Sequence, residues 1–463
     1  MEKRPGSPLL SGLPLEADGA YPRRQRSMGG SATWLVVLSA ACLISGPGLS
    51  RAAEKFTFDA SEYEKKRFDL GGYAELWPEY LPADQDAALY QLAFFGREQE
   101  DNLSRTDAVL ELEGRYNRDV LTFFFRTHSN VLWDFDGTEQ QNKLFEGVLS
   151  VQPASNLTLE AGKKANRWGK GTFWNPVGFI ERRKDPNDPD LARQGYWMAS
   201  MDWVRSFDGP LQTVSFTPVV VPTVEGLNSD FGEPEHLNLA GKLYMLYRNT
   251  DFDLMFLTGG ARTPRIGLDF SRNLAPNFEV HGELAYIADF ERILLDPAPG
   301  CRTRNAGEQD VTSYLLGLRY RSDQDIAYTL EYFFDGTGNS PEQQRRYYDC
   351  VHTAWDEDNA ALMARLKSSQ LVGRYARPNP MREYVGFRAA WNEPLDILYF
   401  TPALQAFYNL DDNSLQLAPE LSYTGLGNFE FRLRGTVPIG STLTEWGEKA
   451  NEFKIDLRVR YYF

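Results

Sequence analysis

The sequence predicts an all-β chain that closes into a transmembrane antiparallel β-barrel of about eighteen strands, within a range of sixteen to eighteen. Three observations support this fold class: apolar and charged residues alternate in many short segments, short and long connections alternate between these segments, and aromatic residues are frequent in a polar chain. The aromatic content is 13% and the mean hydropathy is -0.45, which argues against a helical membrane protein. A barrel fits such a composition because only every second residue of a strand faces lipid.

The alternation is clearest in the last residues, "NEFKIDLRVRYYF" at 451–463. Side chains along a strand point to opposite faces in turn, so one face here is apolar and the other is charged. In an outer membrane the apolar face would meet lipid and the charged face would line a wet lumen. The apolar residues are Phe453, Ile455, Leu457, Val459, Tyr461 and Phe463, and the charged ones are Lys454, Asp456, Arg458 and Arg460.

Similar segments recur along the chain, mostly with the 9–11 residues that a tilted strand needs to cross a bilayer. We predict strands at 68–77, 106–116, 119–129, 143–152, 156–163, 200–207, 211–220, 238–248, 251–260, 264–272, 277–289, 311–321, 325–334, 382–392, 395–408, 414–424, 428–437 and 453–463.

The connections between these segments indicate how the barrel is oriented. After even-numbered strands they are short and rich in Gly, Pro, Asn and Asp, as hairpin turns are. After most odd-numbered strands they are long, although 261–263 and 409–413 are short. This pattern predicts short periplasmic turns, long external loops and both ends of the barrel on the periplasmic side. The long connections are 78–105, 164–199, 221–237, 290–310, 335–381 and 438–452.

The start of the chain has the features of a secretory signal peptide. Basic residues precede the apolar run at 32–49, and small residues follow it, with cleavage expected after Ala52 or Ala53. A membrane anchor helix and a lipidated Cys42 are the alternatives. We therefore divide the chain into a signal peptide (1–52), a periplasmic N-terminal segment (53–67) and an outer-membrane β-barrel (68–463).

Charge and cysteine content narrow the partners. The formal net charge is -15, whereas a nucleic-acid-binding protein needs a basic surface, so no nucleic acid is expected. Cys301 and Cys350 lie beyond the signal peptide, in two loops that the topology places on the external side. An exported chain with such a pair is expected to form a disulfide.

The connection at 162–198 is unusually basic for this acidic chain, and it contains Trp168, Trp174 and Trp197. Aromatic residues at this density usually pack, so we expect the loop to fold into the lumen and concentrate anions there. The alternative is a solvated external loop that faces lipopolysaccharide. The basic residues are Lys163, Lys164, Arg167, Lys170, Arg182, Arg183, Lys184 and Arg193.

Within this region "AGKKANRWGKGTFWNPVGF" and the later "DWVRSFDGPLQ" resemble stretches of the alginate-export-type outer-membrane porins, over residues 157–210. The resemblance implies an eighteen-stranded barrel with an arginine-rich constriction, and it makes Arg167, Arg182 and Arg205 candidates for that constriction. Inward-pointing charges on the strands are of both signs. We add to the predicted anion site the loop residues Lys170 and Arg183 and, on the last two strands, Arg432, Arg434, Arg458 and Arg460.

The terminal strand also resembles the signal that the outer-membrane assembly machinery of Gram-negative bacteria reads, through Tyr461 and the final Phe463. The alternative is that these aromatic residues only complete the interfacial girdle of the barrel. Both interpretations place the chain in the outer membrane, in contact with its lipid and lipopolysaccharide.

Motifs for catalysis and cofactor binding are missing from the sequence. There is no G-x-S-x-G, H-E-x-x-H, P-loop or C-x-x-C-H motif, so we expect no enzyme activity, no cofactor and no metal site. The residue types of a membrane phospholipase triad occur at 128–130, but neighbours on a strand point to opposite faces. The preferred hypothesis is a porin-like channel for small polar or anionic solutes. The alternatives are a barrel that sheathes a multihaem cytochrome and an outer-membrane lipid hydrolase.

Overall fold

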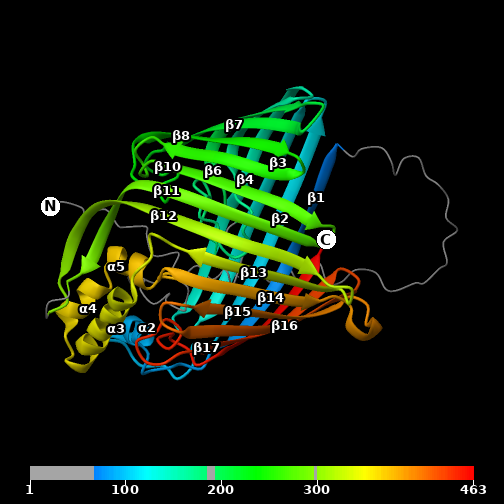
Figure 1. The fold of residues 1–463 in the computed structure, drawn as a ribbon. Coiled ribbons are helices and arrows are strands. Elements are labelled where there is room, and N and C mark those ends of the chain that lie inside the picture. The colour runs from blue at the N-terminus through cyan, green and yellow to red at the C-terminus, as the bar shows by residue number, and fades with distance from the viewer. Residues whose placement is uncertain (1–66, 185–192, 297–299) are drawn as a thin grey trace.

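A computed structural model describes residues 67–184, 193–296 and 300–463, and these residues form a closed antiparallel barrel (Figure 1). Each strand pairs with its neighbours in sequence, and β1 also pairs with β18. The eighteen strands of the described chain are β1 (Phe68–Tyr80), β2 (Arg105–Arg118), β3 (Leu121–Asp134), β4 (Gly137–Ala154), β5 (Leu157–Lys164), β6 (Tyr196–Ser206), β7 (Leu211–Thr223), β8 (His236–Tyr247), β9 (Thr250–Thr258), β10 (Arg265–Ala275), β11 (Phe278–Leu295), β12 (Thr303–Arg321), β13 (Ile326–Phe334), β14 (Glu383–Trp391), β15 (Phe400–Asn409), β16 (Ser414–Leu426), β17 (Phe429–Ile439) and β18 (Lys454–Tyr462).

The predicted fold class and each predicted strand are therefore confirmed, with shifts at the strand ends. The predicted signal peptide (1–52) and all but the last residue of the predicted periplasmic segment (53–67) lie outside the described residues.

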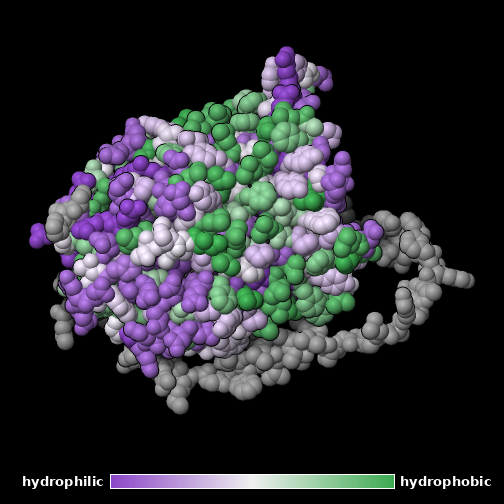
Figure 2. All heavy atoms as spheres, turned by 60° about the horizontal axis from the view of Figure 1, so that its bottom comes forward, coloured by the Kyte–Doolittle hydropathy of each residue, from purple (hydrophilic) through white to green (hydrophobic). Residues whose placement is uncertain are grey.

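The two faces of the barrel wall follow the alternation of the sequence. On β18, Ile455 and Leu457 are 46% and 40% exposed, while Asp456 and Arg458, which alternate with them, are buried inside the barrel. Apolar side chains gather over the strands, and hydrophilic ones gather at the end that carries the helices (Figure 2). This is the surface of an outer-membrane β-barrel, whose apolar band meets lipid.

The periplasmic turn between β8 and β9 is a two-residue hairpin turn. It contains only Arg248 and Asn249, whose φ angles are 48° and 58°. Positive φ at both central residues is the geometry of a type I′ turn, which matches the twist of the flanking strands.

The last residue of the chain takes part in barrel closure. The N–H of Phe463 donates to the carbonyl of Gly72 and the N–H of Gly72 donates to the carbonyl of Phe463, both at 3.1 Å. These two bonds continue the β1–β18 ladder, which pairs Tyr73 with Tyr462. Phe463 therefore belongs to the seam where the first and last strands meet.

Four helices form a cap at the external end, next to the extended hairpin of β11 and β12 (Figure 1). They are α2 (Ala88–Phe94), α3 (Pro341–Asp356), α4 (Ala360–Leu366) and α5 (Ser369–Tyr375), and they share one apolar core. Among the described residues, no helix is both long enough and apolar enough to span a bilayer. The sequence interpretation missed these helices, although Ser340, Pro341 and Gln343 begin α3 with a complete capping box.

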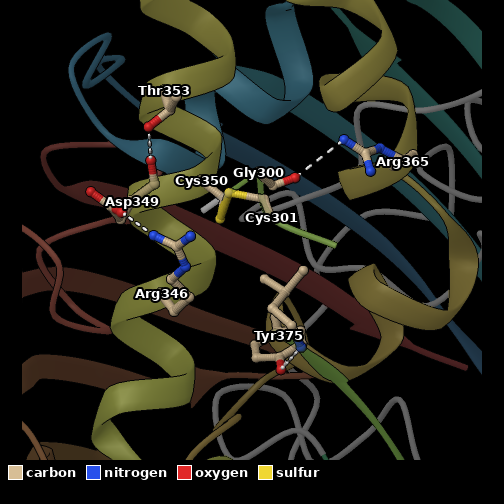
Figure 3. The surroundings of a disulfide bond; sticks show 9 residues. Gly300, Cys301, Arg346, Asp349, Cys350, Thr353, Arg365 and Tyr375 are labelled. Carbon is tan, nitrogen blue, oxygen red and sulfur yellow. Dashed lines mark hydrogen bonds and ion pairs between the residues drawn. A yellow bond between two sulfur atoms is a disulfide. The ribbon is translucent and has the colours of Figure 1, made fainter. Parts of the chain in front are cut away.

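The predicted disulfide is present between Cys301 and Cys350, whose Cα atoms are 6.0 Å apart (Figure 3). It ties the tip of the β11–β12 hairpin to α3. Two hydrogen bonds reinforce this link: the N–H of Leu295 donates to the hydroxyl of Tyr375 at 3.3 Å, and the guanidinium of Arg365 reaches the Gly300 carbonyl at 3.5 Å.

Several strand boundaries differ clearly from the prediction. Most of the predicted loop at 290–310 is strand, because β11 and β12 continue to Leu295 and from Thr303. The strand predicted from residue 395 begins only at Phe400, because several preceding residues, including Leu395 at φ 56° and Tyr399 at φ 63°, have the left-handed backbone of a turn.

Candidate constriction and anion-binding site

In the basic connection between β5 and β6, the described residues 165–184 lie along the inner wall of the barrel. The backbone N–H groups of Lys170 and Gly171 both donate to Glu283 of β11 at 2.6 Å. Those of Thr172 and Phe173 donate to Glu331 of β13 at 2.5 and 3.0 Å. Glu283 and Glu331 are buried on the inner face, since Leu284 and Leu330 beside them are exposed to the outside. The segment 169–173 is thus attached to the inner wall through its own backbone.

Apolar side chains of the same loop pack against the inner wall on both sides of this attachment. Trp168, Val177 and Phe179 join buried residues of the strands from β6 to β11. Phe173 and Trp174 join buried residues of β12 to β15, and the ring of Trp174 stacks on Phe333 at 5.3 Å.

Gly386 on β14 makes this packing possible. A Cβ atom there would lie 2.6 Å from Phe173 and 2.9 Å from Trp174. A side chain at this position would force the loop away from the wall, so glycine is needed for the close approach.

A cavity of about 280 Å³ lies between the loop and the external ends of β10 to β13. Five basic side chains and two carboxyl groups line it, so its walls carry a surplus of positive charge. The basic residues are Arg182, Arg183, Lys184, Arg262 and Arg265, and the carboxyl groups belong to Glu181 and Asp335.

Glu181 contributes little negative charge at neutral pH. Burial raises the pKa of this carboxyl to about 8, although it accepts hydrogen bonds from the backbone of Trp168 and from Asn175. Asp335 is then the ionised carboxylate of the cavity, opposed by five cationic side chains. An anion entering the cavity is attracted by this imbalance, and the attraction is stronger near a protein wall than in bulk water.

Three loop residues of the predicted anion site, Lys170, Arg182 and Arg183, form ion pairs. Arg182 pairs with Asp230 and also donates to the carbonyl of Gln194 at 3.0 Å. Arg183 approaches Asp335 at 3.3 Å, with its side chain 49% exposed. Lys170 donates to Asp253 at 2.8 Å on the inner wall, so its charge is largely neutralised there.

The other two candidates derived from the family resemblance lie apart from this cavity. Arg167 is on an exposed part of the loop. Arg205 lies near the periplasmic end of β6, on the same face as the exposed Trp203, and its guanidinium sits 5.1 Å from the ring of Phe207. The structure therefore brings Arg182 and Arg183 together at the cavity and places Arg167 and Arg205 away from it.

The arginines of the last two strands form a separate group on the inner wall, where Arg432 pairs in register with Arg458. Arg460 donates to Glu75 of β1 at 2.7 Å, and Arg458 lies 3.6 Å from the ring centre of Trp77. Arg434, also buried, pairs in register with Asp456. Acidic neighbours thus offset part of the positive charge in this group.

Several residues of the site were not singled out from the sequence. Arg262 donates to the Phe179 carbonyl at 2.8 Å and so holds the loop from the β9–β10 side. Arg265 opens β10 at the external end of the barrel. The available signal was that Arg262 lies in the connection after an odd-numbered strand and Arg265 lies at the start of the next strand, so the loop rule places both beside the external mouth.

No family model and no curated protein matches the sequence. Solved structures of similar fold exist, each covering 86% of this chain. OpdL of Pseudomonas aeruginosa is 11% identical, with 98% of its chain covered and a TM-score of 0.50. OccK2 (OpdF) of the same organism, solved in complex with glucuronate, is 11% identical, with 98% covered and a TM-score of 0.48. OprD of the same organism is 13% identical, with 97% covered and a TM-score of 0.46. At these identities the likeness is one of fold.

Proposed function

We propose that this protein is an outer-membrane channel for the passive passage of small polar or anionic solutes, with residues 165–184 of the loop after β5 as its constriction. One observation carries the proposal: a basic loop is bound by hydrogen bonds to Glu283 and Glu331 inside a closed barrel. A loop held inside a wide barrel narrows the lumen, and in porins a water-filled path remains beside it.

The contacts of the loop suggest the route of the solute. The apolar part of the loop packs on the wall from β6 to β15, and the inner face of β16 to β18 and β1 lies in the rest of the wall, next to β2 to β5. That face carries Arg434, Arg458 and Arg460 together with Glu75 and Asp456. We infer that solutes pass between the loop and this charged face.

We assign the preference for anions to the cavity that Arg182, Arg183 and Lys184 help to line. Five basic groups face one ionised carboxylate there, whereas the strand wall is mixed. The preference should be strongest at low salt, because the Debye length is about 10 Å at 0.1 M and about 3 Å at 1 M.

The two alternative functions meet specific obstacles. A sheath for a multihaem cytochrome needs a wide lumen, but Trp168, Phe173 and Trp174 already occupy the interior. A lipid hydrolase would need the triad types at 128–130 to converge. Instead, His128 stacks on Phe145 at 4.5 Å and Asn130 donates to Asp107 at 3.2 Å.

The remaining partners are inferred from the surface and the last strand. The exposed apolar band is expected to contact outer-membrane lipid, with lipopolysaccharide around the external end. We assign to Tyr461 and Phe463 the additional role of an assembly signal. The resemblance of residues 157–210 to alginate-export-type porins supports an anionic solute and does not name it.

Planar bilayers provide the test. Purified barrel should produce discrete ion-conducting steps, and its reversal potential in a tenfold gradient of KCl at low salt should have the sign of an anion-selective pore. A barrel that inserts but never conducts, or that prefers cations, would contradict the proposal.

A further inference from the structure

We propose that the external mouth contains a binding site for a compact oxyanion that carries two negative charges, such as inorganic phosphate, formed by five arginines around residues 335–339. The arginines are Arg183, Arg292, Arg374, Arg377 and Arg382, which we call the arginine cluster. This site adjoins the cavity described above and shares Arg183 with it. The proposal rests on the proposed channel only for the route by which the anion arrives.

The arginine cluster is assembled from four parts of the chain. Arg183 comes from the inward loop, Arg292 from the external part of β11, Arg374 from the last turn of α5, and Arg377 and Arg382 from the connection between α5 and β14.

These residues meet at the turn that follows β13. Arg377 and Arg183 approach Asp335 at 3.0 and 3.3 Å. Arg292 donates to the carbonyl of Gly336, and Arg382 donates to that of Gly338 at 3.3 Å.

The turn also holds Arg374 in place. The side-chain amide of Asn339 donates to the backbone carbonyl of Arg374 at 3.2 Å. The guanidinium of Arg374 lies 5.8 Å from the ring centre of Tyr375. Five arginines that lie between positions 183 and 382 of the sequence thus surround one turn of five residues, 335–339.

The arginine cluster has a large excess of positive charge. Asp335 is the one carboxylate that forms ion pairs with these guanidiniums in the described part of the chain. Burial alone would raise the pKa of Asp335, but Arg377 and Arg183 hold it below its ordinary value, so this group supplies one full negative charge. Asp411 lies nearby, yet it accepts from the backbone N–H of Arg382 rather than from its guanidinium.

Several guanidinium nitrogens of the arginine cluster are buried without a hydrogen-bond partner among the described residues. They are Nε and Nη2 of Arg374, Nε of Arg292 and Nε of Arg377. A buried donor without an acceptor is costly, and most buried polar groups in folded proteins are satisfied. Like charges brought together out of water add to that cost. An anion bound among these arginines would supply both the missing acceptors and the missing negative charge.

The residue type indicates the chemistry of that anion. All five groups are arginine and none is lysine, and the planar guanidinium fork matches the oxygens of phosphate or carboxylate in a bidentate manner. A monocarboxylate has one charge and one pair of oxygens, too few for donors that approach from four segments. Phosphate at pH 7.5 is mostly divalent and offers oxygens in four directions. A lipid phosphate is a less suitable source, because Arg292 and Asp335 are buried and do not face the membrane.

Calorimetric titration of the purified full-length barrel, with its disulfide intact, tests this site. Inorganic phosphate at pH 7.5 and constant ionic strength should bind with one-to-one stoichiometry, whereas acetate should bind at least tenfold more weakly. The variant Arg374→Gln/Arg377→Gln should reduce the phosphate affinity at least tenfold. The matched control Arg345→Gln/Arg365→Gln removes two exposed charges from the same cap and should bind as the wild type does.

A second variant separates recognition from folding. Arg374→Lys/Arg377→Lys keeps both charges but removes the forks, so it should also lose affinity while its disulfide and its heat-dependent gel mobility stay unchanged. Absence of phosphate binding to the wild type, equal binding of acetate, or an equal loss of affinity in the control would each overturn the proposal. Because binding is measured without conduction, this result is independent of whether the barrel proves to be an open channel.

Discussion

The carboxylate of Glu331 on β13 accepts a hydrogen bond at 3.0 Å from the backbone N–H of Phe173, which lies 158 residues earlier in the chain. The same carboxylate accepts from Thr172 at 2.5 Å and lies 3.2 Å from Nε2 of His281. A single buried side chain therefore fixes two consecutive residues of the constriction loop against the wall. By holding the loop against the wall, this hydrogen bond helps to set the width of the lumen.

Removing that carboxylate should loosen the constriction. A hydrogen bond to a charged group contributes about 1.5–3 kcal/mol, so Glu331→Ala should release the segment 169–173 in part of the population. We expect larger single-channel conductance and more open-state noise, with a smaller effect for Glu331→Gln, which keeps one acceptor. Asp310→Ala is the control, because this exposed carboxylate accepts from the hydroxyl of the exposed Tyr286 at 2.5 Å, on the outer face of the barrel. Equal changes in Glu331→Ala and in the control would contradict the anchoring role.

The anion preference should depend on pH through Glu181. Burial raises the pKa of this carboxyl to about 8, so it is mostly neutral at pH 7 and ionises as the pH rises towards 9. The added negative charge beside Arg182 and Arg183 should shift the reversal potential towards cations over that range. The variant Glu181→Gln cannot ionise and should show a smaller shift. An identical pH response in wild type and variant would exclude Glu181 as the cause.

The disulfide should stabilise the cap rather than the barrel. Cys301 and Cys350 are 49 residues apart in sequence, and a cross-link that closes a loop of this length contributes about 4 kcal/mol in the chain-entropy model. The variant Cys301→Ser/Cys350→Ser should therefore expose residues 335–382 to limited proteolysis, while the barrel keeps its heat-dependent gel mobility. Reduction of the wild type should have the same effect. Two free thiols in unreduced wild-type protein would remove the basis of this prediction.

The terminal seam should determine the yield of inserted barrel. Deleting Phe463 removes both hydrogen bonds to Gly72, and Leu457→Arg places a charge on the lipid face at a cost of about 2–4 kcal/mol at mid-membrane. Both variants should lower the inserted fraction in outer-membrane preparations. Asn428→Arg adds a charge in the exposed turn before β17 and should leave the yield unchanged. A normal yield for Leu457→Arg would show that our assignment of the lipid face is wrong, and a normal yield without Phe463 would show that the seam bonds are not required for insertion.

The strands of the barrel could be predicted because the sequence patterns that specify them are local. Alternation with a period of two identified the faces of Ile455 and Asp456, and turn residues marked most hairpins. The same rule failed at 395–399. Leu395, Ile397 and Tyr399 alternate like a strand, but the backbone turns there and the chain pairs only from Phe400.

The site could be predicted only in part, because its geometry depends on long-range contacts. Basic composition and tryptophan content indicated an inward loop, and Arg182 and Arg183 do line a cavity. Nothing near Glu331 in the sequence shows that it accepts from Phe173, and nothing near Arg374 shows that it meets Arg292. The resemblance that selected Arg205 concerned a stretch of sequence and carried no information on which face of β6 this residue occupies.

The central claim is that the basic loop controls the passage of ions, and the reversal potential of loop variants tests it most directly. The triple variant Arg167→Ala/Arg182→Ala/Arg183→Ala should move the reversal potential towards cations in a low-salt KCl gradient, and 1 M salt should remove most of the difference because the Debye length falls to about 3 Å. The control Arg205→Ala/Arg302→Ala/Arg304→Ala removes equal charge from exposed positions away from the loop and should resemble the wild type. If the loop variant keeps the wild-type reversal potential at low salt, the loop lies outside the conduction path and the account is wrong.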